Sequence, residues 1–203
     1  MDLTHYERFK SHLEHGDRAG AALHIERFVA SFGQIEEKSV WVRWYLDHEE
    51  IGHRIRHEIY EHLVFPVLLQ GYRQADPWAI RWLIRTVQNL YKADHLWIKL
   101  DRRTEHGLLT ELQALCPSDK EVRLSLLQSH IRQFRYVINE WPAGILYGHD
   151  GASQEECTHI LLDVENARRL DIESVYSTFL NGVESKVLEY LAQLVRRRAR
   201  DDA

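Results

Sequence analysis

The sequence predicts an all-α fold of eight or nine helices, arranged in antiparallel hairpins that stack as a short solenoid or close as an irregular bundle. Three observations support this prediction. Apolar residues recur at steps of three and four along most of the chain. Ser and Asp residues that can cap a helix stand where several of these runs begin. No segment shows the sustained alternation of apolar and polar residues that a strand requires.

The first two runs predict a helical hairpin over residues 2–33. Gly16 and Asp17 separate them, because glycine ends helices readily and aspartate caps the start of the next one. The second run closes at Gly33. The following segment, Ile35–Leu46, is apolar on nearly every side, so we expect it to be buried.

Prolines mark the helices in the middle of the chain. Residues 50–65 form a predicted helix that Pro66 should end or kink, because proline lacks an amide N–H and its ring clashes with the preceding turn. Asp76 and Pro77 then give a clear helix start, an N-cap followed by proline at the first helical position. The apolar stripe of this helix runs on to Tyr91.

Two capping boxes and a long amphipathic run predict the helices of the C-terminal part. Ser118 with Glu121, and Ser153 with Glu156, have the spacing at which a hydroxyl and a carboxylate satisfy each other's free backbone amides. From Ile172 onward, apolar residues at helical spacing predict one amphipathic helix to the C-terminal end.

Composition predicts one cytoplasmic domain over residues 1–203. With 44% hydrophobic residues, the 203-residue chain can bury a core without disulfides or metals. We find no secretory signal and no apolar run of the roughly 18 to 20 residues that a membrane-spanning helix needs. The two cysteines, Cys116 and Cys157, are far apart and lack Cys-x-x-Cys spacing, as expected of reduced cytosolic thiols.

The net charge of −5 does not favour nucleic acid as a partner. One basic cluster stands out near the C-terminal end, and it consists of Arg196, Arg197, Arg198 and Arg200. Arginine in the last turns of a helix also complements the helix dipole, which is the interpretation we prefer. A nucleic-acid binder that uses this cluster is our third hypothesis, and strong salt dependence would support it.

The segment Leu115-Cys116-Pro117-Ser118-Asp119-Lys120-Glu121-Val122 resembles the junction between successive tetratricopeptide-type repeats. There, a proline ends one hairpin, and an Asp with a Glu begins the next. The four prolines do not recur at the 34-residue spacing of that repeat, so the resemblance implies helical hairpins only. The chain is also similar to uncharacterised bacterial all-helical proteins, some of which are antitoxin-like immunity partners.

The segment His48–His62 contains four histidines and four glutamates. At about 100° per residue, one side of the predicted helix carries two of each, which could bind a metal ion. These residues are Glu50, His53, His57 and Glu61. The same side lies opposite the apolar stripe, where charged pairs simply support a solvated helix. A second Glu-x-x-His pair, Glu156 and His159, raises the possibility of a di-iron bundle but matches by chance at this Glu and His content. We therefore predict no metal and no cofactor.

One side of the helix after Asp76 combines tryptophan and arginine, the residues most enriched in binding hot spots. The residues are Trp78, Arg81, Trp82, Arg85 and Asn89. They form either a partner-binding surface or the second buried face of a sandwiched helix. Because no catalytic motif is present, the preferred function is a non-enzymatic module that binds another protein, with an immunity or antitoxin-like role as one specific form. The alternative is a metal-dependent helical-bundle enzyme built on the Glu and His cluster.

Overall fold

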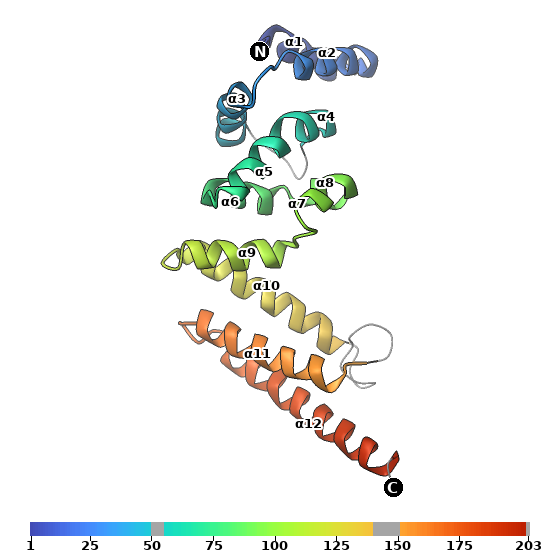
Figure 1. The fold of residues 1–203 in the computed structure, drawn as a ribbon, viewed down its shortest axis with the longest axis vertical. Coiled ribbons are helices and arrows are strands. Elements are labelled where there is room, and N and C mark those ends of the chain that lie inside the picture. The colour runs from blue at the N-terminus through green and yellow to red at the C-terminus, as the bar shows by residue number, and fades with distance from the viewer. Residues whose placement is uncertain (50–54, 140–150, 202–203) are drawn as a thin grey trace. The chain divides into compact units, whose positions relative to one another are not determined.

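The computed structural model describes residues 1–49, 55–139 and 151–201 (Figure 1). Every regular element in these ranges is a helix and none is a strand, which confirms the predicted all-α class. The helices are numbered α1 to α12 with one π-helical segment, η1, so the predicted count of eight or nine is not confirmed. The chain groups into two compact units, Met1–Leu115 and Cys116–Ala203. One domain over residues 1–203 stays a prediction.

The first unit begins with the expected hairpin of α1 (Leu3–Glu14) packed on α2 (Arg18–Ala30). The Asp17 carboxylate accepts a hydrogen bond from the Gly20 amide at 2.9 Å, so Asp17 caps α2 as the sequence predicts. Gly16 has a φ of +73°, a conformation that glycine adopts without steric cost, and it ends α1.

Helix α3 (Ile35–His48) is buried on one side only. The rings of Trp41 and Tyr45 stack within the first unit, with their centroids 4.7 Å apart. Trp44 and Val40 are 47% and 71% exposed, so the prediction that Ile35–Leu46 is buried is wrong for these two residues. Neighbouring elements of the first unit cover the opposite side of α3, which leaves these side chains at the surface.

Three helical segments follow one another without a break, and they are α4 (His57–Ile59), η1 (Tyr60–Val64) and α5 (Phe65–Arg73). Pro66 is predicted to end or kink the helix. It lies in the first turn of α5 and does not end the helix. Proline has no N–H for the carbonyl four residues earlier, that of His62. The Lys38 ammonium donates to this carbonyl oxygen at 3.1 Å. A side chain from α3 thus supplies a donor that Pro66 cannot, beside the π-helical turn.

Four more helices complete the first unit, and they are α6 (Pro77–Arg85), α7 (Val87–Tyr91), α8 (Asp94–Lys99) and α9 (Glu105–Leu115). The Asp76 carboxylate accepts from the Trp78 amide at 2.9 Å, which confirms the predicted cap of α6. The predicted stripe to Tyr91 is interrupted at Thr86, whose hydroxyl donates to the Trp82 carbonyl at 2.6 Å. Helix α6 packs against α5 on one side and α9 on another.

The second unit contains α10 (Lys120–Asn139), α11 (Gln154–Leu170) and α12 (Ser177–Asp201), with α11 packed on both neighbours (Figure 1). The capping box of Ser153 and Glu156 at the start of α11 is confirmed. The C-terminal helix begins later than expected, since Ile172 and Val175 are exposed in the turn before it. The buried core of this unit comprises Leu127, Ile131, Phe134, Val137, Ala152, Cys157, Ile160, Val164, Ala167, Leu180, Val183, Val187 and Tyr190.

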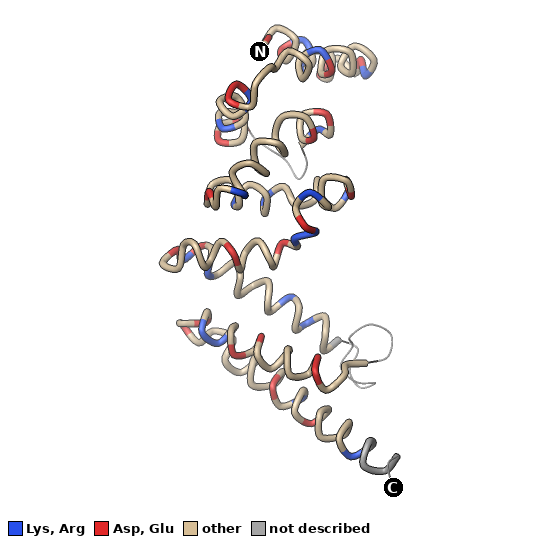
Figure 2. The backbone as a smooth tube through the Cα atoms, viewed as in Figure 1, with Lys and Arg blue, Asp and Glu red and all other residues tan. Residues whose placement is uncertain are grey.

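Charged side chains lie on the helices of both units. Figure 2 shows Lys and Arg interspersed with Asp and Glu along the backbone, so the two signs are mixed rather than separated. Among the helices that the structure describes, none is long and apolar enough to cross a membrane.

The cap of α10 differs from the prediction and can be tested. The Asp119 carboxylate, rather than the Ser118 hydroxyl, accepts from the amides of Glu121 at 2.9 Å and Val122 at 3.1 Å. Asp119→Ala should lower the free energy of unfolding by about 1 kcal/mol, because it leaves helix-terminal amides without this acceptor. Ser118→Ala, the matched control, should change it by less than about 0.5 kcal/mol. Urea denaturation measures both, and a larger loss for Ser118→Ala would contradict this assignment.

Candidate functional site

The structure brings four of the five predicted site residues onto α6, where Trp78, Arg81 and Trp82 are half-buried and Arg85 is exposed. The predicted alternatives are an exposed partner-binding surface and a second buried face. The partial burial lies between them, because neither indole is fully in the core. Both tryptophan residues are partly covered and partly exposed. The tryptophans of α6 therefore have surface available for contact with a partner.

One carboxylate orients both indoles. Trp78 Nε1 donates to Asp47 Oδ1 at 3.1 Å, and Trp82 Nε1 donates to the same oxygen at 3.3 Å. Asp47 lies on α3, one helical turn beyond Arg43, so this contact joins α3 to α6. Two rings held by a shared acceptor lose less rotamer freedom on binding than two free rings would.

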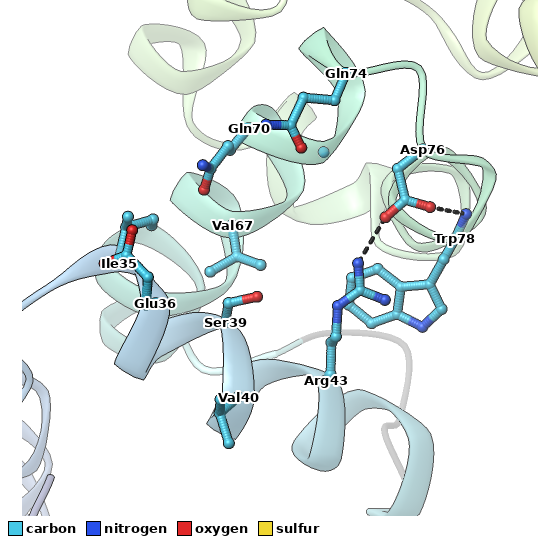
Figure 3. Close-up of a pocket in the computed structure, with 11 residues that line it drawn as sticks. Ile35, Glu36, Ser39, Val40, Arg43, Val67, Gln70, Gln74, Asp76 and Trp78 are labelled. Carbon is cyan, nitrogen blue, oxygen red and sulfur yellow. Dashed lines mark hydrogen bonds and ion pairs between the residues drawn. The ribbon is translucent and has the colours of Figure 1, made fainter.

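Arginine side chains lie over both rings. The Arg43 guanidinium is 4.1 Å from the ring centroid of Trp78, and the Arg85 guanidinium is 5.0 Å from that of Trp82. Arg43 also forms an ion pair with Asp76, at 2.6 Å, as Figure 3 shows. Asp76 thereby serves both as the N-cap of α6 and as the anchor of Arg43. The cation–π contacts place positive charge beside exposed aromatic surface.

A groove of about 270 Å³ lies next to Trp78, between α3, α5 and the start of α6 (Figure 3). Its walls combine apolar side chains with polar ones that can hydrogen-bond to a peptide backbone. The lining residues are Ile35, Glu36, Ser39, Val40, Arg43, Val67, Gln70, Gly71, Gln74, Asp76 and Trp78. The exposed Val40 continues this wall onto the outer face of α3. Sequence reasoning missed α3, because a segment that is apolar on nearly every side predicts burial, whereas Val40 and Trp44 are exposed in the structure.

The fifth predicted residue, Asn89, has a structural role. Its side chain is buried on α7, where Nδ2 donates to the Ile55 carbonyl at 2.8 Å and Oδ1 accepts from the Ile55 amide at 3.2 Å. The carboxamide thus pairs with the backbone of one residue as a neighbouring strand would. Asn89 satisfies buried polar groups and is not part of the exposed face of α6.

Half of the predicted Glu and His cluster can be placed, since Glu50 and His53 lie outside the described residues. His57 Nε2 is 2.7 Å from Glu61 Oε2, and His95 Nε2 of α8 is 2.9 Å from Glu61 Oε1. The hydrogen bond from His95 lowers the pKa of Glu61, and the nearby His57 charge acts in the same direction. Each carboxylate oxygen thus has an imidazole partner. Within the described ranges, no group of three or more His, Cys, Asp or Glu residues is arranged to hold a metal ion.

The remaining candidates for chemistry are the second Glu-x-x-His pair and the two cysteines. Glu156 belongs to the capping box of α11, and His159 is exposed on the same helix. Both cysteines are free thiols. Cys157 is fully buried, and burial raises its pKa, which disfavours the reactive thiolate.

The shared acceptor makes a testable prediction. Asp47→Ala should lower the free energy of unfolding by about 0.5–1.5 kcal/mol and change the tryptophan fluorescence of the folded protein, because two indole N–H groups lose their partner. Asp47→Asn keeps an oxygen acceptor and should lose less. Urea denaturation followed by fluorescence measures both variants. Equal stability of wild type and Asp47→Ala would show that the carboxylate does not hold the rings.

Comparison with protein-family models, curated proteins and solved structures finds no match to this chain. The resemblance of residues 115–122 to a tetratricopeptide-type junction stays a prediction.

Proposed function

We propose that the protein is a non-enzymatic module that binds another protein through the Trp–Arg surface. We define this surface as Val40, Arg43 and Trp44 of α3 together with Trp78, Trp82 and Arg85 of α6. The observation that carries the proposal is that the Asp47 carboxylate accepts a hydrogen bond from each of two indoles. Each of these indoles has an arginine over its ring. The groove beside Trp78 extends the same surface.

The composition of this surface suits binding energetically. Tryptophan and arginine dominate interface hot spots because they combine large contact area with directional polar groups. Trp44, which is 47% exposed, and Val40 add apolar surface that a partner can bury. The existing contacts of Trp78, Trp82 and Arg43 reduce the conformational entropy that binding has to overcome.

The charge of the surface indicates the chemistry of its partner. Arg85 is exposed and lies over Trp82, and Arg43 borders the groove. A complementary protein segment carries an apolar side chain for the groove and a carboxylate that pairs with Arg85, because Arg43 is already paired with Asp76. An immunity or antitoxin-like role in the cytoplasm is one form of this function. We propose in addition that the helical hairpins are arranged as a short solenoid or an irregular bundle. Among the residues that the structure describes, no observation favours the metal-dependent enzyme over this function.

Binding by variants tests the proposal. The full chain is used to capture proteins from extracts of its source cells, and the dissociation constant of any captured protein is measured for each variant. Trp44→Ala and Arg85→Ala should each weaken binding by at least about 30-fold, the effect of a hot spot worth about 2 kcal/mol. Both side chains are exposed, so neither change should alter the melting temperature by more than about 2 °C.

Tyr136→Ala provides the matched control, because Tyr136 is 69% exposed on α10 and lies outside the Trp–Arg surface. It should bind like the wild type. A partner that binds Trp44→Ala and Arg85→Ala as tightly as the wild type would contradict the proposed surface.

A further inference from the structure

Three histidines meet between α1 and α2, on helices that do not contribute to the Trp–Arg surface. His5 Nδ1 of α1 lies 3.0 Å from His24 Nδ1 of α2. The ring of His12, also on α1, stacks on His24 with centroids 5.1 Å apart and planes 20° apart. Carboxylates lie at both ends of the row, since Asp17 is 2.8 Å from His12 and Asp2 is 3.9 Å from His5.

The close pair of nitrogens needs one proton between them. At 3.0 Å, one Nδ1 must donate a hydrogen bond and the other must accept it. If His5 and His24 are both protonated, both nitrogens are donors, so the bond is lost and two positive charges face each other. A metal ion would need further donors. The described residues supply no set of three for one, so a shared proton fits the geometry better.

The surroundings of His24 also oppose a positive charge. The side chain is buried, and the groups that face it are His5, Arg8 and His12 from α1 and Arg27 from α2. Burial and these cationic groups lower the pKa of His24. The carboxylates of Asp2 and Asp17 contact His5 and His12 instead.

Helix α4, which also packs against α2, does not offset this effect from the other side. Its Glu58 lines a cavity with Glu26, Val29 and Ala30 of α2. At about 100° per residue, these three positions lie on the side of α2 opposite His24. The acids beside α4 are therefore not placed to compensate a charge on His24.

The hairpin that these histidines join covers the aromatic side of α3. Tyr6 of α1 and Phe28 of α2 contact Trp41, with ring centroids 5.7 Å and 5.1 Å away. Tyr6 also meets Tyr45, at 6.4 Å. Movement of the hairpin would uncover these rings.

We propose that the α1–α2 hairpin is an acid-sensitive latch, which loosens when His24 and His5 both carry a proton, so that their two Nδ1 atoms are both donors, the hydrogen bond between them breaks and the aromatic side of α3 is uncovered. Proton linkage gives the sign of the pH dependence of the hairpin's stability. An unfolded hairpin takes up the His24 proton near the ordinary histidine pKa of about 6.5, whereas the folded hairpin takes it up only at lower pH. The stabilisation is therefore present above that value and is lost as the pH falls. This regulation is independent of the proposed binding function.

Hydrogen–deuterium exchange of the full chain tests the latch, at about pH 7 and about pH 5 with chelator present and with rates corrected for intrinsic exchange. We expect corrected exchange in residues 18–30 to be at least about tenfold faster at the lower pH, because the hairpin opens more often once this hydrogen bond is lost. Residues 77–85 contain no histidine and should show no such change. Equal acceleration of both segments, or of neither, would overturn the proposal.

Two further measurements assign the effect to His24. His24→Gln should exchange at the same corrected rate at both pH values, whereas His159→Gln, on the exposed side of α11, should behave like the wild type. An NMR titration of wild-type His24 gives an independent readout if His24→Gln does not fold. Its midpoint should lie below about 6.5 and coincide with the change in residues 18–30. A midpoint above that value, or acid sensitivity that persists in His24→Gln, would contradict the latch.

Discussion

The close approach of α5 to α6 at Gly71 is the constraint on which the Trp–Arg surface depends. A Cβ atom at Gly71 would lie 2.5 Å from Ala79 Cβ, a separation that two rigid methyl groups cannot adopt. The same position would be 3.6 Å from Asp76 Oδ2, the oxygen that pairs with Arg43. The absence of a side chain therefore sets the distance between two helices and the place of the carboxylate between them.

The turn after α5 continues this arrangement. The Asp76 amide donates to the Gly71 carbonyl at 2.9 Å and the Ala75 amide donates to that of Tyr72 at 3.0 Å, the two bonds of a Schellman motif. Asp76 is thus fixed at the start of α6, where it caps the helix and holds Arg43 over Trp78. Asp76 therefore links the close packing of α5 against α6 to the position of Arg43 over Trp78.

Local chemistry made the caps Asp17 and Asp76 predictable, because the signals for these helix starts lie within a few residues of sequence. The end of α5 was not predictable, since Ala75 has a φ of +54°, a conformation that usually calls for glycine. The periodicity of α6 predicts that Trp78, Trp82 and Arg85 lie on one side of that helix, and their role as a site stays a prediction. The exposure of Trp44 and the meeting of His95 with Glu61 depend on which helices pack together, and periodicity within one helix does not contain that information.

The most direct test of this account is the NMR spectrum of the tryptophan indole N–H groups in Gly71→Ala. Overpacking at Gly71 should cost about 1–3 kcal/mol and separate α5 from α6, so the signals of Trp78 and Trp82 should both shift. Trp97, whose indole donates to the Arg103 carbonyl, should keep its signal. In the control Gly182→Ala, a Cβ meets no atom within 4 Å, so the Trp78 and Trp82 signals should stay in place. Unchanged Trp78 and Trp82 signals in Gly71→Ala would contradict the claim that the α5–α6 contact positions this surface.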